Sequence, residues 1–211
     1  MDAPGPVTAD DVGLAVRLSA AALRLVPADG WDEAAGPLTW SRWETAEHLA
    51  DDLFAYAAQL GSPDPSSTAH VPFGLRRRTP GGPANTVFVE RSEGPEGLLR
   101  VLEASGALLV AMVRVTAPEL RSHHVFGASD AEGFGAMGVV EALVHTHDMT
   151  ACLDPGRQPP ADLCARVLHR LFPHAPTDAE PWPALLWSTG RLELPGRPRL
   201  TAWRWYGEPR R

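Results

Sequence analysis

The segment from Gly133 to Leu153 constrains this chain more than any other, because its pattern predicts both a helix and a polar site on that helix. Glu141 and His145 lie four residues apart, and Asp148 follows three residues later. On an α-helix these three side chains project from one face. Burying them without partners would be costly, and a Glu/His pair one turn apart can hold a divalent metal from one side. The same segment carries apolar side chains at helical spacing: Phe134, Met137, Val140 and Val144.

Three further segments have the apolar periodicity and the start signals of amphipathic helices. Thr8 precedes the first of them, and Ser41 with Glu44 has the spacing of a capping box at the start of the second. Helices of this length with one apolar stripe pack together, so the predicted fold class is an all-α core, an antiparallel four-helix bundle. The predicted helices cover residues 8–26, 40–60, 95–115 and 132–153.

The bundle is expected to carry a small insert and a tail. Two short alternating runs around TPGGPA, within residues 71–90, predict a β-hairpin insert. The expected domains are a metal-binding bundle over residues 1–155 and a short mixed C-terminal extension, residues 156–211, packed on it. The extension is predicted to contain a helix, an apolar turn and a strand-like segment, at residues 161–172, 184–191 and 199–206.

Composition and charge exclude several classes of protein. The net charge of −7 over 211 residues argues against a nucleic-acid partner, because phosphate binding needs a basic face. The longest purely apolar run, Ala107–Val113, is too short to span a membrane, and the start MDAPGPVTADD lacks the apolar core of a signal peptide. Cys152 and Cys164 form neither a CxxC pair nor a disulfide framework. We therefore expect a cytoplasmic protein with small-molecule partners; its oligomeric state is open, with a homodimer as one alternative.

The two polar residues of one helix cannot fill the coordination shell of a metal, so a facing helix must supply a further ligand. His48 is preferred to His169, since it lies mid-helix with Glu44 and Asp52 at one-turn spacing to hold its second ring nitrogen. Two histidines and one carboxylate would leave an open coordination position, as in catalytic zinc sites. From spacing alone, a set of hydrogen-bonded structural side chains stays open as the alternative. His123 and His124 are expected to be exposed rather than ligands, and His147 is expected to be structural or on the surface.

Two segments of the chain carry a resemblance to a known family. WSRWETAEHLADDL and GVVEALVHTHDMTACL resemble the signature segments of the DinB-like superfamily, and most closely those of its mycothiol-dependent maleylpyruvate isomerase branch. In that family the histidine of an HL pair and an ExxxH motif bind a divalent metal, usually zinc, which implies His48, Glu141 and His145 as ligands. The family's HxxD pattern places Asp148 beside the site. The likeness extends from about Thr8 to Leu153.

The resemblance has one departure. The family's isomerase carries a second α/β domain that contributes to its active site, whereas only residues 154–211 follow the last bundle helix here. The likeness therefore implies a class of chemistry rather than maleylpyruvate as the substrate. Within this shorter region, Arg191 in LLWSTGR is the expected contact for a substrate carboxylate.

The function that follows is that of a metal-dependent enzyme. Zinc would lower the pKa of a bound low-molecular-weight thiol, mycothiol or another small thiol, and so supply a thiolate at neutral pH. The thiolate would add to a small electrophilic metabolite, giving thiol transfer or cis–trans isomerisation, with Asp148 orienting a ligand or shuttling a proton. Two alternatives stay open. One is a hydrolase or lyase that uses metal-bound water, and the other is a non-catalytic binding module of the same fold.

Overall fold

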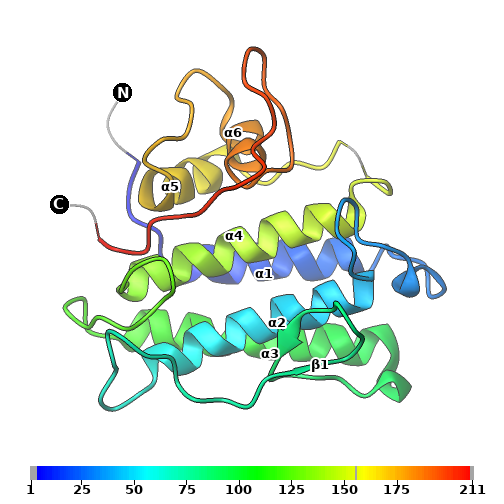
Figure 1. Cartoon of the computed structure of the whole chain (residues 1–211), viewed down its shortest axis with the longest axis horizontal. Helices are drawn as coiled ribbons and strands as arrows, with labels where there is room; N and C mark the ends of the chain where they lie inside the picture. Colours follow the sequence, from blue (N-terminus) through cyan, green and yellow to red (C-terminus); the bar gives the residue numbers. More distant parts are fainter. Residues whose placement is uncertain (1–3, 155, 210–211) are drawn as a thin grey trace.

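The structure is a computed structural model that describes residues 4–154 and 156–209. Four long helices form a bundle, as the sequence predicts, and shorter elements are added to it (Figure 1). The first and fourth of these helices run in one direction and the second and third in the other, because the long connection between the second and third carries the chain back along the bundle (Figure 1). The four are α1 (Ala9–Leu23), α2 (Arg42–Leu60), α3 (Gly94–Val115) and α4 (Ala131–Thr150).

Local sequence signals account for where these helices begin. The Thr8 hydroxyl accepts a hydrogen bond from the Asp11 amide, and the Asp11 carboxylate accepts one from the Thr8 amide, which is a complete capping box. Ser41 and Glu44 form the same arrangement at the start of α2. Asp130 caps α4 by accepting a hydrogen bond from the Gly133 amide at 2.8 Å. The chain entering each of these helices therefore has a defined direction.

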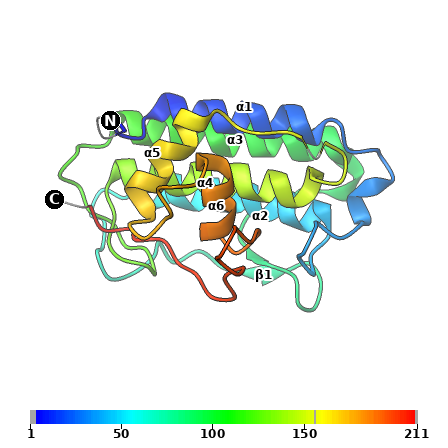
Figure 2. The same ribbon diagram turned by 90° about the horizontal axis from the view of Figure 1, so that it is seen from above.

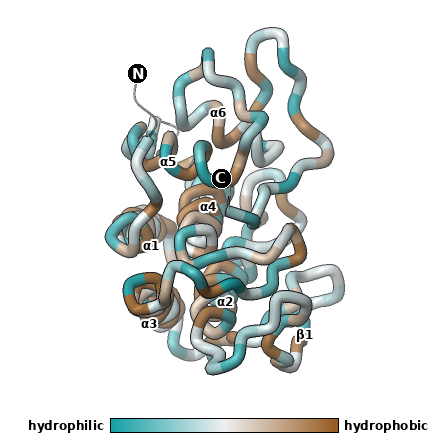
Figure 3. Tube along the Cα trace, turned by 90° about the vertical axis from the view of Figure 1, so that its left-hand side faces the viewer, coloured by the Kyte–Doolittle hydropathy of each residue, from teal (hydrophilic) through white to brown (hydrophobic). Residues whose placement is uncertain are grey.

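The packing of the bundle makes α2 and α4 direct neighbours. Helix α2 packs against α3 and α4, and α1 packs against the same two helices. Figure 3 views the bundle end on, with the four helices at the corners of a square. Gly138 lets α4 come close to α3, since a Cβ there would lie 2.5 Å from a methyl carbon of Leu109. Residues on the facing sides of α2 and α4 are thereby brought together in the interior.

Helix α4 is buried on nearly all sides. The other bundle helices cover one side of it, and α5 (Ala161–Leu171) packs on the other. Figures 1 and 2 agree that α5 and α6 (Pro181–Ser188) lie over α4. An interior helix offers no solvent to unpaired polar groups. The polar residues of α4 must therefore find partners within the protein.

The hairpin insert is much shorter than the sequence predicts. Strands β1 (Arg76–Arg77) and β2 (Ala84–Asn85) pair antiparallel over two residues each. Beyond them, backbone amides donate to carboxylates of α2 instead of to a partner strand. Asp51 accepts from the amides of Thr86 and Val87 at 2.8 and 2.7 Å. The insert is thus fixed to the bundle surface by α2.

The C-terminal region differs from its prediction in two places. The expected apolar turn is part of helix α6, and the strand-like residues 199–206 form no strand in the described part of the chain. The backbone there bonds to separate segments. The Tyr206 amide donates to the Leu171 carbonyl, and the Gly207 amide donates to the Phe126 carbonyl. No single strand lies alongside to complete a ladder.

Ion pairs connect this region to the bundle. Arg166 of α5 pairs with Asp11 at 2.6 Å, and Arg170 pairs with Asp130 at 2.8 Å. With the packing of α5 on α4, these contacts join the C-terminal region to the bundle. We propose a bundle over residues 1–155 and an extension over residues 156–211 that packs on it. Residues 155 and 210–211 at these boundaries lie outside the described residues. Among the helices that are described, none has the length and apolar character needed to cross a membrane.

Candidate metal centre

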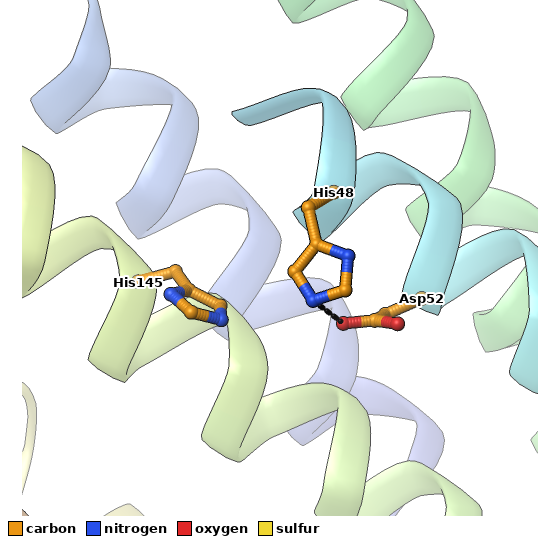
Figure 4. A group of neighbouring side chains, drawn as sticks. All are labelled: His48, Asp52 and His145. Atoms are coloured by element: carbon orange, nitrogen blue, oxygen red, sulfur yellow. Dashed lines mark ion pairs between the residues drawn. The ribbon is translucent and has the colours of Figure 1, made fainter. Parts of the chain in front are cut away.

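Side chains of α2 and α4 converge between the two helices. His48 and Asp52 come from α2 and His145 comes from α4, and each offers one ligand atom within 4.8 Å of the other two (Figure 4). The two α2 residues are one helical turn apart, so they project toward α4 together. Imidazole nitrogens and a carboxylate oxygen at such separations are a donor set that fits a divalent metal such as zinc.

The ring of His48 is held by both of its nitrogens. Its Nδ1 lies 3.2 Å from Oδ1 of Asn85, and its Nε2 lies 3.3 Å from Oδ2 of Asp52. An amide oxygen only accepts hydrogen bonds, so Nδ1 carries the proton and Nε2 presents its lone pair to the cluster. The sequence prediction gave the holding of the second ring nitrogen to Asp52 or Glu44. It was wrong for both, because Asn85 lies at Nδ1, Asp52 lies at Nε2, and Glu44 caps its own helix at Ser41.

Asn85 is the site residue that sequence reasoning missed. It is the only asparagine in the chain, it lies on β2, and it is buried. No periodicity links the hairpin to α2, so the sequence carries no signal that would place this amide beside a histidine of α2.

The ring of His145 is held in a similar way. Its Nδ1 lies 3.1 Å from Oδ2 of Asp148, and its Nε2 lies 3.1 Å from Oε2 of Glu141. Asp148 is also gripped by Arg191, whose Nη2 and Nε donate to its two oxygens at 2.8 and 3.2 Å. A continuous chain of contacts therefore runs from Glu141 through His145 and Asp148 to Arg191, from one turn of α4 to the segment after α6.

Glu141 lies next to the three-residue cluster rather than within it. The mutual distances bring Asp52 into the cluster as the carboxylate donor, and Glu141 reaches it through the Nε2 of His145. The other carboxylate oxygen of Glu141 accepts a hydrogen bond from the Tyr56 hydroxyl at 3.4 Å. Two carboxylates thus border the same two imidazoles, where the sequence prediction assigned only Glu141 as a ligand.

Burial and neighbouring charge perturb every titratable group of the cluster. Burial and the positive charge of His145 lower the pKa of His48. Burial disfavours a charged His145, yet its hydrogen bonds to Asp148 and Glu141 raise its pKa to about 9. Burial and the nearby charge of Glu141 raise the pKa of Asp52 well above its usual value. Glu141 is paired with the cationic His145. Asp52 has no arginine partner within the described residues, and a divalent cation beside it would stabilise its charged form.

A cavity of about 240 Å³ opens beside the cluster. His48, His145 and Arg191 line it, together with the indoles of Trp40 and Trp203. The Trp40 ring centroid lies 5.0 Å from that of His48, and the Arg191 guanidinium lies 5.7 Å from the centroid of Trp203. The cavity therefore joins a cationic side chain and apolar walls to the donor atoms.

The remaining histidines fall outside the cluster. His147 packs against Trp182 with ring centroids 5.7 Å apart, on a different side of α4, in line with the expected structural role. His123 is half-buried, but His124 is buried, so the expectation that both are exposed was wrong. The reason is tertiary, since His124 packs against Tyr56 and Trp205.

The helices and the cluster together define a four-helix bundle with histidines and carboxylates gathered between two of its helices. Among solved structures, this chain is similar to a mycothiol-dependent maleylpyruvate isomerase, at 17% identity and a TM-score of 0.50, over 76% of this chain and 68% of the isomerase chain. A variant of that isomerase with one histidine replaced by alanine matches at 16% identity, with the same coverage and TM-score. No family model and no curated protein matches the chain. At this identity the likeness shows a shared fold.

Proposed function

We propose that this protein is a metal-dependent enzyme that uses a small thiol to transfer to, or isomerise, a small electrophilic metabolite. The observation that carries the proposal is the convergence of two imidazole Nε2 atoms, each ring anchored through its Nδ1, with buried carboxylates. We propose His48, Glu141 and His145 as the metal ligands, with Asp52 as a further donor. Zinc bound there would lower the pKa of a coordinated thiol and so provide a thiolate at neutral pH.

The protein's own groups have distinct tasks in this proposal. Asn85 and Asp148 hold the two imidazoles so that Nε2 of each faces the metal position. Asp148 is occupied by His145 and Arg191, and although burial opposes it, these contacts lower its pKa. We therefore propose that Asp148 orients His145 and does not shuttle a proton. The indole of Trp40, packed on the His48 ring, would limit the access of water to the donor atoms.

Arg191 is the proposed contact for a carboxylate on the electrophile. Its guanidinium has five N–H groups, of which two donate to Asp148 and one donates to the Thr189 carbonyl. Two N–H groups are left for a ligand in the cavity that Arg191 lines. The electrophile would therefore be a small carboxylate-bearing molecule, bound on the side of the cluster that faces Trp40 and Trp203.

The structural neighbours favour mycothiol or another small thiol as the cofactor, because both are forms of a mycothiol-dependent maleylpyruvate isomerase. We also propose a cytoplasmic location, since Cys152 and Cys164 are both free thiols, as is usual in a reducing compartment.

The first test is the metal content of purified protein. His145→Ala should lose most of the bound zinc, whereas His147→Ala should retain it, because His147 packs on Trp182 away from the cluster. Equal retention of zinc in the two variants would refute the ligand assignment.

The second test replaces zinc with cobalt and follows the visible spectrum as thiol is added. A thiolate-to-cobalt charge-transfer band should appear in the parent protein and should be absent in Glu141→Ala. If no small thiol produces the band, the thiol-dependent function is wrong, and metal-bound water becomes the nucleophile to test.

A further inference from the structure

A second cavity, of about 340 Å³, lies against the metal centre and shares no lining residue with the cavity that holds Arg191. Asp52, a member of the three-residue cluster, lines it. Tyr56 also lines it, and its hydroxyl reaches across to Glu141. The two cavities thus meet the metal centre on different sides, and the contact between Tyr56 and Glu141 lies between them.

The walls of this second cavity are fixed by the fold. The connection after α2 is tied to α2 by Gln59, which donates to the Ala69 carbonyl at 3.2 Å and accepts from the Val71 amide at 2.9 Å. The same connection is tied to the α3–α4 loop, since the His123 amide donates to the Ser66 carbonyl at 2.8 Å. Figure 1 shows these two connections meeting at one end of the bundle. The cavity is therefore formed before any ligand arrives, as ligand sites usually are.

The polar groups in the walls are mostly uncharged. His70, His123 and His124 all line the cavity, and the rings of His70 and His123 are 4.5 Å apart. Nδ1 of His124 accepts a hydrogen bond from the Phe126 amide, so a neutral ring carries its proton on Nε2. Burial lowers the pKa of His124 to about 4, and burial lowers the pKa of His70 as well. At neutral pH the ring of His70 can both donate and accept hydrogen bonds, and the ring of His124 can donate one from Nε2.

The charge and the apolar surface of the cavity further limit the class of ligand that it can bind. Among the described residues, no arginine lines it and its only carboxyl groups are those of Asp51 and Asp52, so an anionic ligand would meet no arginine there. Phe73 and Leu75 stand in its wall with 40% and 64% of their surface exposed. Exposed apolar side chains beside neutral donors and acceptors suit a ligand with hydroxyl groups and a carbon framework.

We propose that this second cavity binds the uncharged, hydroxyl-bearing carrier of the thiol, while the cavity of Arg191 takes the carboxylate-bearing electrophile. The inference rests on the proposed function, because it assigns the two reactants of that function to two sides of one metal centre. Two reactants entering from different sides can meet at the metal without competing for space.

The test compares two thiols on the cobalt-substituted protein. The probe 1-thio-β-D-glucose carries an uncharged hydroxylated ring, and ethanethiol carries none. Ala55→Trp adds bulk from α2 into the second cavity, and Ala58→Trp makes the same change on α2 at a half-buried position that does not line it. From the charge-transfer band we expect Ala55→Trp to lower the affinity ratio of thioglucose to ethanethiol by at least about tenfold, and Ala58→Trp to leave it unchanged.

Two further measurements keep the test independent of how well Ala55→Trp folds. His70→Phe, at an exposed loop position, keeps the ring but removes its hydrogen bonds and should weaken thioglucose only. Methyl β-D-glucoside, which has no thiol, should compete with thioglucose and not with ethanethiol.

The outcomes separate the two claims. A cobalt–thiolate band with both thiols, with an affinity ratio that Ala55→Trp leaves unchanged, overturns the carrier site and leaves the thiol function standing. The absence of a band with either thiol overturns both.

Discussion

Asn85→Ala should weaken metal binding although residue 85 touches no metal. The wild-type amide oxygen accepts the Nδ1 proton of His48 at 3.2 Å, and the Asn85 side chain is buried. With a metal on Nε2, the ring proton must stay on Nδ1. Alanine would then leave a buried N–H without a partner. In the metal-free protein the proton can instead move to Nε2, where Asp52 lies 3.3 Å away and accepts it. The penalty therefore falls on the metal-bound state.

The magnitude follows from the cost of an unsatisfied buried donor, about 1–3 kcal/mol. Because about 1.4 kcal/mol corresponds to a factor of ten in an equilibrium constant, the dissociation constant for zinc should rise by about 5–150-fold. Asn85→Asp keeps an oxygen acceptor at the same place, so it should retain most of the affinity.

The assay is a competition between the protein and a chromophoric zinc chelator, at pH 7.5 and with matched protein concentrations. Urea unfolding of each variant with chelator present checks that the metal-free fold is intact. If Asn85→Ala folds normally and binds zinc as tightly as the parent protein, the anchoring of His48 by Asn85 has no part in the metal site.

Three other predictions concern stability without metal. The pKa of His145 is raised from 6.5 to about 9, so its stabilising charge is fully present below pH 6.5 and is lost as pH rises through 9. Chelator-treated protein should therefore lose about 3 kcal/mol of unfolding free energy over that range, and His145→Gln should show no such loss. Arg191→Met leaves the buried Asp148 carboxylate without its arginine and should cost about 3–5 kcal/mol in urea unfolding; a loss under about 1 kcal/mol would contradict this. Gly36→Ala and Gly81→Ala both place alanine at positive φ, which should cost each variant roughly 1–2 kcal/mol of stability. Only at Gly36 would the new Cβ also lie 2.8 Å from the Asp148 carbonyl oxygen, so the thermal midpoint of Gly36→Ala should fall further than that of Gly81→Ala; equal midpoints would show that the carbonyl contact adds nothing.

The bundle could be predicted from local patterns because long helices carry their signals in neighbouring residues. The capping boxes at Thr8 and Ser41 and the apolar stripes located the four helices to within a few residues. The likeness of two solved structures confirms the fold class. The hairpin was overestimated because its amides bond to carboxylates of α2 such as Asp51. Residues 199–206 have strand-like alternation, but a strand needs a partner that this fold does not place beside them.

The sequence by itself determined which polar residues share a face of α4, because the spacing of Glu141, His145 and Asp148 is a property of one helix. The roles of His48, Glu141 and His145 as metal ligands and of Arg191 as a substrate contact stay predictions. Only the tertiary structure decided that Asp52 enters the cluster, that Asn85 holds His48, and that Arg191 grips Asp148. The physical reason is that these contacts join residues from separate elements, and their distances depend on how helices and loops pack, which no local spacing encodes.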